Sequence, residues 1–364
     1  MSISQHKKNE LLAISTELAS RKTEALRLYN PADYQEPFHA SLASERLILG
    51  GNRSGKTMSA MIEVARAATG QDPHGKFPKK DGVGCLVGRD WKHIGTVLYP
   101  MLFKPGAFQI IKDEKTKQWR SFNPDTDSHR MDDRRPAPPL IPERMIKKMS
   151  WQMKSANYLN SCELTNGWEL YFYSSESYPP QGKAYDLAAA DEEIQNDSWL
   201  PELQARLADK KGRLIVAAMP HSTAEWLVHL SERAEAEEKK EGPKNIEQFR
   251  FRFLDNEHID SEEKTKMIER WSAQGADVLR QRAEGEFTFD TLSVYPQFSM
   301  YTHGYNREDL PDRQVPPDWT RYLAIDPGHQ VAAAIFFAVP PDEDMWLFYD
   351  CLLYTSDAAD DVRG

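Results

Sequence analysis

The sequence predicts an α/β protein built on a largely parallel sheet. Short apolar runs of strand length alternate with segments whose apolar residues recur at helical spacing, a pattern typical of βαβ units. A glycine-rich turn at residues 50–57 joins the first of these strands to a helix. The chain has 364 residues, of which 40% are hydrophobic and 28% charged, so it can form a sizeable core and two or three domains.

Composition excludes several classes of protein. With 46 basic and 56 acidic residues the net charge is −10, so the chain is not a basic nucleic-acid coat, although a local patch is compatible with DNA binding. No stretch is apolar enough for a transmembrane helix, and we expect no membrane partner. Residues 1–29 lack the apolar core of a signal peptide and are interpreted as an amphipathic helix. Three scattered cysteines (Cys85, Cys162 and Cys351) have neither zinc nor disulfide spacing, as in a reducing cytosol.

Five apolar runs predict the strands of the sheet. They are ERLILGG (45–51), VGCLVG (83–88), WELYFYS (168–174), YDLAAAD (185–191) and RLIVAA (213–218). After the first run, GKTMSAMIEVARAATG predicts a helix that Gly70 ends. Residues 113–144 are rich in charge and proline, and we expect an insertion or surface loop there rather than sheet.

The later part of the chain predicts a helical subdomain and then a new domain. STAEWLVHLSERAEAEEKKEG (222–242) has helical spacing with a solvated charged face, and a second helix opens near Asp260. These helices place a subdomain at about 221–300, within a larger domain of 30–300. Residues 301–318 are polar and contain proline, so we interpret them as a linker. A further strand, RYLAIDPG, follows at 321–328.

The glycine-rich turn matches the phosphate-binding motif G-x-x-x-x-G-K-[ST] at Gly50, Gly55, Lys56 and Thr57. Glycines let backbone N–H groups close around phosphate oxygens, and the following helix N-terminus adds its positive end. The lysine reaches the β- and γ-phosphates, and the threonine hydroxyl is a magnesium ligand. The sequence therefore predicts a site for ATP and Mg²⁺, and its nucleotide-binding residues are Gly50, Gly51, Asn52, Arg53, Ser54, Gly55, Lys56 and Thr57.

Hydrolysis needs a second strand that ends in an acid for magnesium, and a base that orients water. YDLAAADEEI supplies Asp191 for the metal and Glu192 for the water, with Glu193 as a competing base. The alternative is that these acids form the N-terminal turn of a helix. With both motifs in place, the fold class is a P-loop ATPase of the ASCE type.

Beyond the two motifs, most of residues 28–340 resembles the large terminase subunit of tailed bacteriophages, an ATP-driven DNA-packaging motor. LILGGNRSGKT resembles its phosphate loop, and YFYSSESYPPQGKAYDLAAADEE resembles the run into its magnesium and catalytic carboxylates. GRLIVAAMP resembles its coupling strand, whereas RQRAEGEF and VYPQF resemble the end of its ATPase region. YNPADYQEPFHAS resembles its adenine-recognition segment, which implies that Gln35 reads the base.

The resemblance also implies what the protein does and where. The expected function is ATP hydrolysis that translocates double-stranded DNA into a viral prohead, with DNA cleavage by the full-length protein. Implied partners are double-stranded DNA, the portal protein, the small terminase subunit and further copies of the chain in a ring on the prohead. The implied location is the cytoplasm of the host cell.

Three positions depart from the family pattern. Many terminases carry their loop arginine one position before Arg53. The coupling strand reads Ala217-Ala218-Met219 and lacks the usual hydroxyl, which leaves Ser222 or Thr223 as candidate sensors of the γ-phosphate. Lys183 stands near the place of an arginine that is proposed to act on a neighbouring subunit. Arg206 is an alternative finger, unless it forms a salt bridge on an exposed helix.

RYLAIDPG resembles the first strand of an RNase H-like nuclease, and this implies that Asp326 binds the first Mg²⁺ or Mn²⁺ of that domain. From Trp319 to Gly364 there is room for two strands, RYLAIDPGHQVAAAIFFAV (321–339) and MWLFYD (345–350), and the domain is placed at 319–350. Asp350, at the end of the second strand, is a weaker candidate ligand. We therefore expect a truncated nuclease domain that does not cleave DNA. CLLYTSDAADDVRG (351–364) resembles a translated sequencing adapter, so we expect this tail not to belong to the natural protein.

Three other functions fit parts of the sequence. A superfamily 2 helicase shares the P-loop and the acidic pair, but AIDPG stands where its second lobe would develop. A small-molecule kinase would need lid and substrate residues that have no counterpart here. The third alternative is a non-catalytic fragment that binds nucleotide or DNA without turnover.

Overall fold

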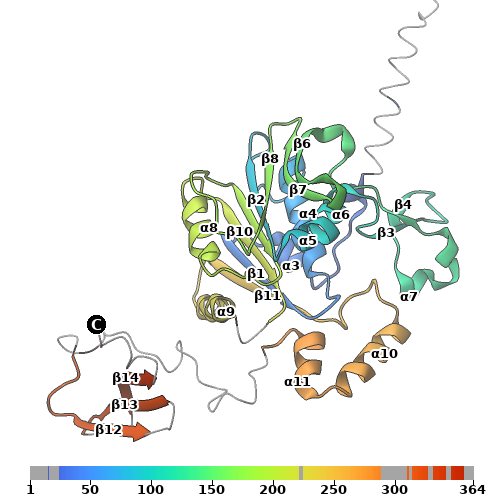
Figure 1. Cartoon of the computed structure of the whole chain (residues 1–364). Coiled ribbons are helices and arrows are strands. Elements are labelled where there is room, and N and C mark those ends of the chain that lie inside the picture. Colours follow the sequence, from blue (N-terminus) through green and yellow to red (C-terminus); the bar gives the residue numbers. More distant parts are fainter. Residues whose placement is uncertain are drawn as a thin grey trace, which may run out of the picture. The chain divides into compact units, whose positions relative to one another are not determined.

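The computed structural model describes residues 15, 24–220, 224–287, 310, 314–326, 331–341 and 346–355, and Figure 1 shows it. The chain divides into two compact units, Met1–Leu292 and Ser293–Gly364. The predicted helix over 1–29 lies largely outside the described residues, apart from α2 (Ala25–Leu28). Most of the predicted linker at 301–318 also lies outside them.

An eight-stranded sheet forms the centre of the first unit, in the order β11-β1-β10-β9-β2-β8-β7-β6. All five predicted strands are confirmed: β1 (Glu45–Gly50), β2 (Val83–Gly88), β8 (Glu169–Ser174), β9 (Leu187–Asp191) and β10 (Arg213–Ala218). These five and β11 (Ile246–Phe251) are parallel. Two antiparallel strands, β7 (Tyr158–Leu164) and β6 (Ile146–Met153), extend one edge. The predicted α/β class with a largely parallel sheet is therefore confirmed.

Helices cover both faces of the sheet (Figure 1), so its central strands are buried on both sides. Alternate residues of a strand point to opposite faces. In β1, Ile48 packs with the layer that contains α4 (Lys56–Thr69) and α6 (Tyr99–Phe103). Leu47 and Leu49 pack instead with α8 (Trp199–Ala208) and α9 (Glu225–Glu238). This two-sided burial explains why the strands read as continuous apolar runs.

Several other helical elements of the first unit are short. They are α3 (Glu36–Ala40), α5 (Trp91–His93), the π-helix η1 (Ile94–Leu98) and the 3-10 turns η2 (Ser128–Asp133), η3 (Glu143–Met145) and η4 (Lys154–Ala156). The predicted stop of α4 is confirmed, because Gly70 adopts φ +70° and its N–H closes the last turn on Ala67 and Arg66. Among the described helices, none is long and apolar enough to cross a bilayer.

The expectation of no sheet in residues 113–144 is wrong. A separate three-stranded antiparallel sheet forms there from β3 (Gln109–Lys112), β4 (Trp119–Ser121) and β5 (Arg135–Pro136), with α7 (Pro124–Asp127) following β4. Its charges are paired locally: Arg120 bonds both carboxylate oxygens of Asp127 at 2.6 and 2.7 Å. Local ion pairs thus account for the charge-rich composition.

Of the predicted helical subdomain at about 221–300, α9 and β11 belong to the main sheet and its core, whereas α10 (Ser261–Ser272) contributes Trp271 to a separate core. Asp260 caps α10 through the N–H of Glu263 at 2.9 Å. The short α11 (Ala276–Leu279) and the π-helix η5 (Arg280–Glu284) follow. Phe253, Trp271 and Ala283 form a small core of their own beneath these helices. A separate core makes residues 252–284 a distinct packing unit next to the sheet.

The second unit contains a three-stranded antiparallel sheet, β12-β13-β14. Two strands were expected between 319 and 350, but three are present: β12 (Thr320–Asp326), β13 (Val331–Val339) and β14 (Leu347–Thr355). β12 and β13, which pair antiparallel, both come from the apolar segment that was expected to form a single strand. The last strand continues into residues 351–355 of the expected tail, and residues 356–364 lie outside the described part of the chain.

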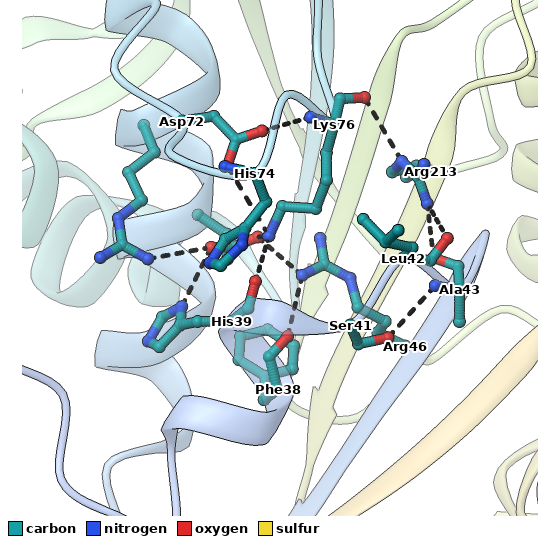
Figure 2. Close-up of polar contacts among 12 residues, drawn as sticks. Phe38, His39, Ser41, Leu42, Ala43, Arg46, Asp72, His74, Lys76 and Arg213 are labelled. Atoms are coloured by element: carbon teal, nitrogen blue, oxygen red, sulfur yellow. Dashed lines mark hydrogen bonds and ion pairs between the residues drawn. The ribbon is translucent and has the colours of Figure 1, made fainter.

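A buried charge cluster lies under α4, and Figure 2 shows it in detail. Its centre is Glu63, whose carboxylate contacts Arg46 at 2.6 Å, Lys76 at 2.5 Å, His39 at 3.0 Å and Arg66 at 3.4 Å. Burial opposes ionisation of Glu63, but its cationic and hydrogen-bonding partners outweigh burial and hold its pKa well below the ordinary range. The cluster ties α4 to α3, to β1 and to the loop after α4.

Candidate functional site

The phosphate loop leaves β1 at its carboxyl end and enters α4. Arg53 (φ +57°) and Gly55 (φ +89°) both adopt left-handed backbone conformations. Gly51 approaches the backbone of η5 so closely that an added Cβ would lie 1.6 Å from the carbonyl oxygen of Arg282. The glycines therefore serve packing against residues 282–285 as well as the curvature of the loop.

Lys56 folds back over this loop. Its ammonium donates to the carbonyl oxygen of Gly51 at 3.0 Å and lies 3.9 Å from Glu192 Oε1. The hydroxyl of Ser54 donates to the same carbonyl at 3.0 Å. Lys56 is only 5% exposed, so its charge is held at the centre of the loop, where phosphate oxygens would replace a backbone carbonyl as its partner.

Asp191 ends β9 and brings three segments together. Thr57 Oγ1 donates to Asp191 Oδ2 at 3.1 Å, and His93 Nε2 lies 2.8 Å from the same oxygen. Asp191 is 1% exposed, and its Oδ1 is buried without a hydrogen-bond partner among the described residues. A buried carboxylate oxygen without a donor is unfavourable unless a cation or water satisfies it.

These oxygens fit a magnesium ion. Mg²⁺ takes oxygen ligands, and nucleotide sites commonly bind it through one or two carboxylates, the substrate phosphates and water. Thr57 and Asp191 supply one hydroxyl and one carboxylate, with Oδ1 free to bind. Within the described ranges, no three His, Cys, Asp or Glu side chains group as a metal site, so the protein alone offers no complete cage.

Glu192 is held in an unusual backbone conformation directly after β9. Its φ is +67°, and its N–H donates to the carbonyl oxygen of Ala217 on the neighbouring β10 at 2.7 Å. The Glu192 side chain lines a cavity of about 600 Å³ together with the phosphate loop. Glu193 is partly exposed and does not line that cavity.

The cavity extends from the loop toward the small sheet of residues 109–136. Both polar and apolar side chains line it. The lining includes Arg53, Lys56, Thr57, Glu192, Asn256 and Arg134, and the apolar residues Met58, Met101, Phe108 and Phe122. A volume of this size is in the range of small-molecule and cofactor sites.

Gln35 lies behind the loop, is 1% exposed and does not line the cavity. Its Nε2 donates to Ser59 Oγ of α4 at 3.1 Å. Its Oε1 accepts from Tyr29 Oη at 3.2 Å and from the N–H of Ala32 at 3.0 Å. Both amide atoms therefore have protein partners.

The structure does not gather the candidate arginines at one point. Arg53 is exposed and lines the cavity, whereas Arg206 lies on α8 and bonds Glu202 through Nε at 2.7 Å. Lys183 is also outside the cavity lining, with its ammonium 3.7 Å from the ring centroid of Tyr171. Ser222 and Thr223 lie outside the described residues.

In the second unit, Asp326 and Asp350 are not adjacent. Asp326 ends β12 opposite Ala333, whereas Asp350 on β14 is opposite Phe336. The two acids are therefore separated by the middle strand and by three positions of register. Asp326 is exposed.

Sequence reasoning missed three residues around the loop. His93 contacts Asp191; Asn256 Nδ2 donates to the carbonyl of Arg53 at 2.6 Å; and Tyr34 Oη donates to the carbonyl of Ser54 at 3.0 Å. Burial disfavours the charged imidazole of His93, but its hydrogen bond to Asp191 and the charge of that residue outweigh burial and raise its pKa. Its only local signal was its place just after the VGCLVG strand.

The fold and this site define a P-loop nucleotide-binding protein of the ASCE type. β10 separates β1, which enters the phosphate loop, from β9, which ends at Asp191. The family model for the terminase large subunit, T4likevirus-type, N-terminal, matches residues 47–300, and the chain belongs to that family.

Three solved structures are similar at low sequence identity. The large terminase of a thermophilic bacteriophage in complex with ADP is 14% identical (91% of this chain and 70% of that chain; TM-score 0.46). The Thermus phage P74-26 large terminase ATPase domain is 14% identical (72% and 96%; 0.47), and the HK97 bacteriophage large terminase is 11% identical (90% and 64%; 0.44). No curated protein matches the chain.

Proposed function

We propose that this chain is an ATP-hydrolysing motor subunit that translocates double-stranded DNA into a viral prohead. Membership of the terminase large subunit family supports the proposal. The observation that carries it is that Thr57 contacts Asp191 and Lys56 lies 3.9 Å from Glu192, beside a cavity that Lys56, Thr57 and Glu192 line. Those groups supply the phosphate contact, the metal ligands and the base that ATP hydrolysis needs.

Each residue has a separate role in this proposal. Lys56 leaves the carbonyl of Gly51 to bind the β- and γ-phosphates, while the backbone N–H groups of the loop surround them. Thr57 and Asp191 hold Mg²⁺, which neutralises charge on the transferred phosphoryl group when it is bound. Glu192 orients the attacking water and accepts its proton.

Two arginines are proposed to stabilise the γ-phosphate. Arg53 lines the cavity and is exposed, so it can reach a bound nucleotide of its own subunit. Arg206 would act on a neighbouring copy in a ring and would have to leave Glu202 to do so. Lys183 is the alternative to Arg206.

Gln35 is proposed to select adenine, the role implied by its sequence segment. Because both of its amide atoms bond protein groups, reading a base requires it to exchange Ser59 or Tyr29 for the base edge. ATP is the proposed nucleotide.

The proposed partners are double-stranded DNA, the portal protein, the small terminase subunit and other copies of the chain, in the host cytoplasm. A full-length protein would add a nuclease in which Asp326 binds Mg²⁺ or Mn²⁺. The strands β12 and β13, together with β14 as far as Asp350, are the proposed beginning of that RNase H-like domain.

Steady-state ATPase measurements with and without double-stranded DNA test the motor proposal. We expect magnesium-dependent ATP hydrolysis that Lys56→Ala abolishes and that DNA alters. Nucleotide binding with no turnover under either condition would instead favour a non-catalytic fragment. Single-molecule translocation on DNA would separate a packaging motor from a simple ATPase.

A further inference from the structure

His93 is fixed beside Asp191 by the register of two parallel strands. β2 pairs with β9 so that Gly88 lies opposite Asp191. The chain leaves β2 through Asp90, whose carboxylate accepts the N–H of His93 at 2.6 Å and caps α5. These two constraints place the imidazole at the end of β9 without help from a nucleotide.

A glycine makes this close approach possible. A Cβ added to Gly88 would lie 2.8 Å from Ile94 Cγ1 and 3.3 Å from His93 Cδ2. Any side chain there would push α5 away from the strand ends. The helix continues as the π-helix η1, a local distortion that is common at functional sites.

Donors at Asp191 are distributed unequally between its two oxygens. Oδ2 receives the hydroxyl of Thr57 at 3.1 Å and lies 2.8 Å from His93 Nε2. Since a carboxylate only accepts, Nε2 must carry the proton and donate it. Oδ1 is buried with no donor among the described residues. Both protein donors therefore hold one oxygen and leave the other for a cation.

We propose that His93 is a positioning residue that orients the carboxylate of Asp191 so that Oδ1 binds the magnesium of the nucleotide. This inference rests on the proposed ATPase function. Groups that hydrogen-bond a metal-binding carboxylate fix its orientation, and their loss commonly lowers metal affinity 10–100-fold. His93 itself contacts neither metal nor substrate in this role.

Two amide substitutions separate the hydrogen bond from mere occupation of space. The Nε2 of glutamine can reach the position of His93 Nε2, whereas the shorter asparagine cannot. Mg²⁺ is titrated while the affinity for a fluorescent ADP analogue is measured, and the Mg²⁺ midpoint is the concentration that gives half of the full gain in affinity. The affinity for the same analogue is also measured in EDTA. ATPase activity against Mg²⁺ is measured in parallel. His229→Ala, at a 60% exposed histidine on α9, is the matched control.

We expect His93→Asn to raise that Mg²⁺ midpoint about 10–100-fold, His93→Gln to restore most of it, and His229→Ala to leave it unchanged. Binding in EDTA should be the same for all four proteins. Thermal unfolding is recorded for each, and His93→Leu replaces His93→Asn if the latter does not fold.

A Mg²⁺ midpoint in His93→Asn equal to that of the wild type overturns the inference. An equal rise of the Mg²⁺ midpoint in His93→Asn and His93→Gln also overturns the inference, as does weaker binding of the ADP analogue in EDTA. Either result would mean that a general distortion of the site is the cause. If the wild type binds nucleotide and hydrolyses ATP, either result rejects only the role of His93. If the wild type binds no nucleotide, the proposed function and this inference both fail.

Discussion

The hydroxyl of Tyr29 lies 3.2 Å from Gln35 Oε1 and 3.0 Å from His39 Nε2. His39 in turn contacts Glu63, and Gln35 contacts Ser59, so a continuous chain of buried hydrogen bonds runs along α4. One end of this chain is the charge cluster of Figure 2, and the other lies next to the phosphate loop. A continuous path of hydrogen bonds through Tyr29 therefore joins the cluster to the surroundings of the loop.

Gln35→Ala tests the proposed adenine reader. The substitution removes an amide that can both donate to and accept from a base edge, so the preference for ATP over GTP should fall. The measurement is the ratio of kcat/KM for the two nucleotides. An unchanged ratio combined with a lower melting temperature would assign Gln35 to bracing of α4 alone. Glu36→Ala, at an exposed neighbour on α3, is the control.

Glu63→Gln should lower the free energy of unfolding by about 3–5 kcal/mol, because it leaves Arg46 buried without its counter-charge and leaves Lys76 with only the carboxylate of Asp72 at 3.8 Å. Arg46 is already under-satisfied: its Nε and Nη2 have no hydrogen-bond partner among the described residues, and its guanidinium lies 4.9 Å from the Phe38 ring centroid. Urea unfolding of the variant measures the change.

The control for this prediction is Glu262→Gln on α10, which removes an exposed i,i+4 pair with Lys266. An exposed helix pair contributes about 0.3–0.5 kcal/mol, so the two substitutions should differ several-fold in effect. Equal effects would mean that the buried cluster contributes no more than a surface ion pair.

The same cluster predicts loss of stability in acid. Burial lowers the pKa of His39 below its ordinary 6.5, despite its hydrogen bond to Glu63, and the pKa of Glu63 lies well below 4.5. Below pH 6.5 the unfolded chain therefore binds a proton at His39 that the folded chain does not, and below pH 4.5 it binds another at Glu63. The free energy of unfolding should fall from about pH 7 to 5 and fall further below 4.5.

Urea unfolding at a series of pH values in the wild type and in His39→Gln checks this pH dependence. The difference between the two curves isolates His39 from the other titrating groups. If His39→Gln retained the full slope between pH 7 and 5, the cluster would not be its source.

Sequence patterns predicted the centre of the fold because buried parallel strands leave a simple signal. β1 and β9 are apolar runs bounded by glycine or an acid. α4 begins after Gly55 and ends at Gly70, and both glycines can be recognised in the sequence. The outer strands leave no such signal. IEQFRF of β11 and IKKMSWQM of β6 carry polar residues because they are only partly buried. Their pairing depends on neighbouring strands that are distant in the sequence, and the local sequence does not predict these neighbours.

The candidate site divides in the same way. Lys56, Thr57 and Asp191 belong to motifs whose spacing is fixed by one turn or one strand end. The contact between His93 and Asp191 joins residues 98 positions apart and depends on the pairing of β2 with β9. The small sheet near the cavity was not predicted because its segment is rich in charged residues, as a solvated loop is. In the structure some of these charges form ion pairs, such as that of Arg120 with Asp127.

Gly51→Ala tests the contact between the phosphate loop and η5. The new methyl group would overlap the carbonyl of Arg282, so η5 or the loop must move. Overpacking of this kind costs about 1–3 kcal/mol, and nucleotide affinity should fall with it because the loop is displaced. Gly75→Ala, where nothing lies within 4 Å of the added Cβ, strains a left-handed backbone (φ +66°) far from the loop in sequence and should leave nucleotide affinity unchanged. Equal affinities in the two variants would contradict a coupling between η5 and the loop.

Glu192→Gln should keep ATP binding and lower kcat by about 10²–10⁴-fold, the range for loss of a general base. The amide retains the size of the side chain but cannot accept the proton of the attacking water. Glu193→Gln is the matched control, because Glu193 is the next residue and does not line the cavity. Binding of a fluorescent ATP analogue and single-turnover hydrolysis separate the two steps. Full turnover in Glu192→Gln with loss in Glu193→Gln would move the base by one residue, and the left-handed turn at Glu192 would then serve to aim its neighbour.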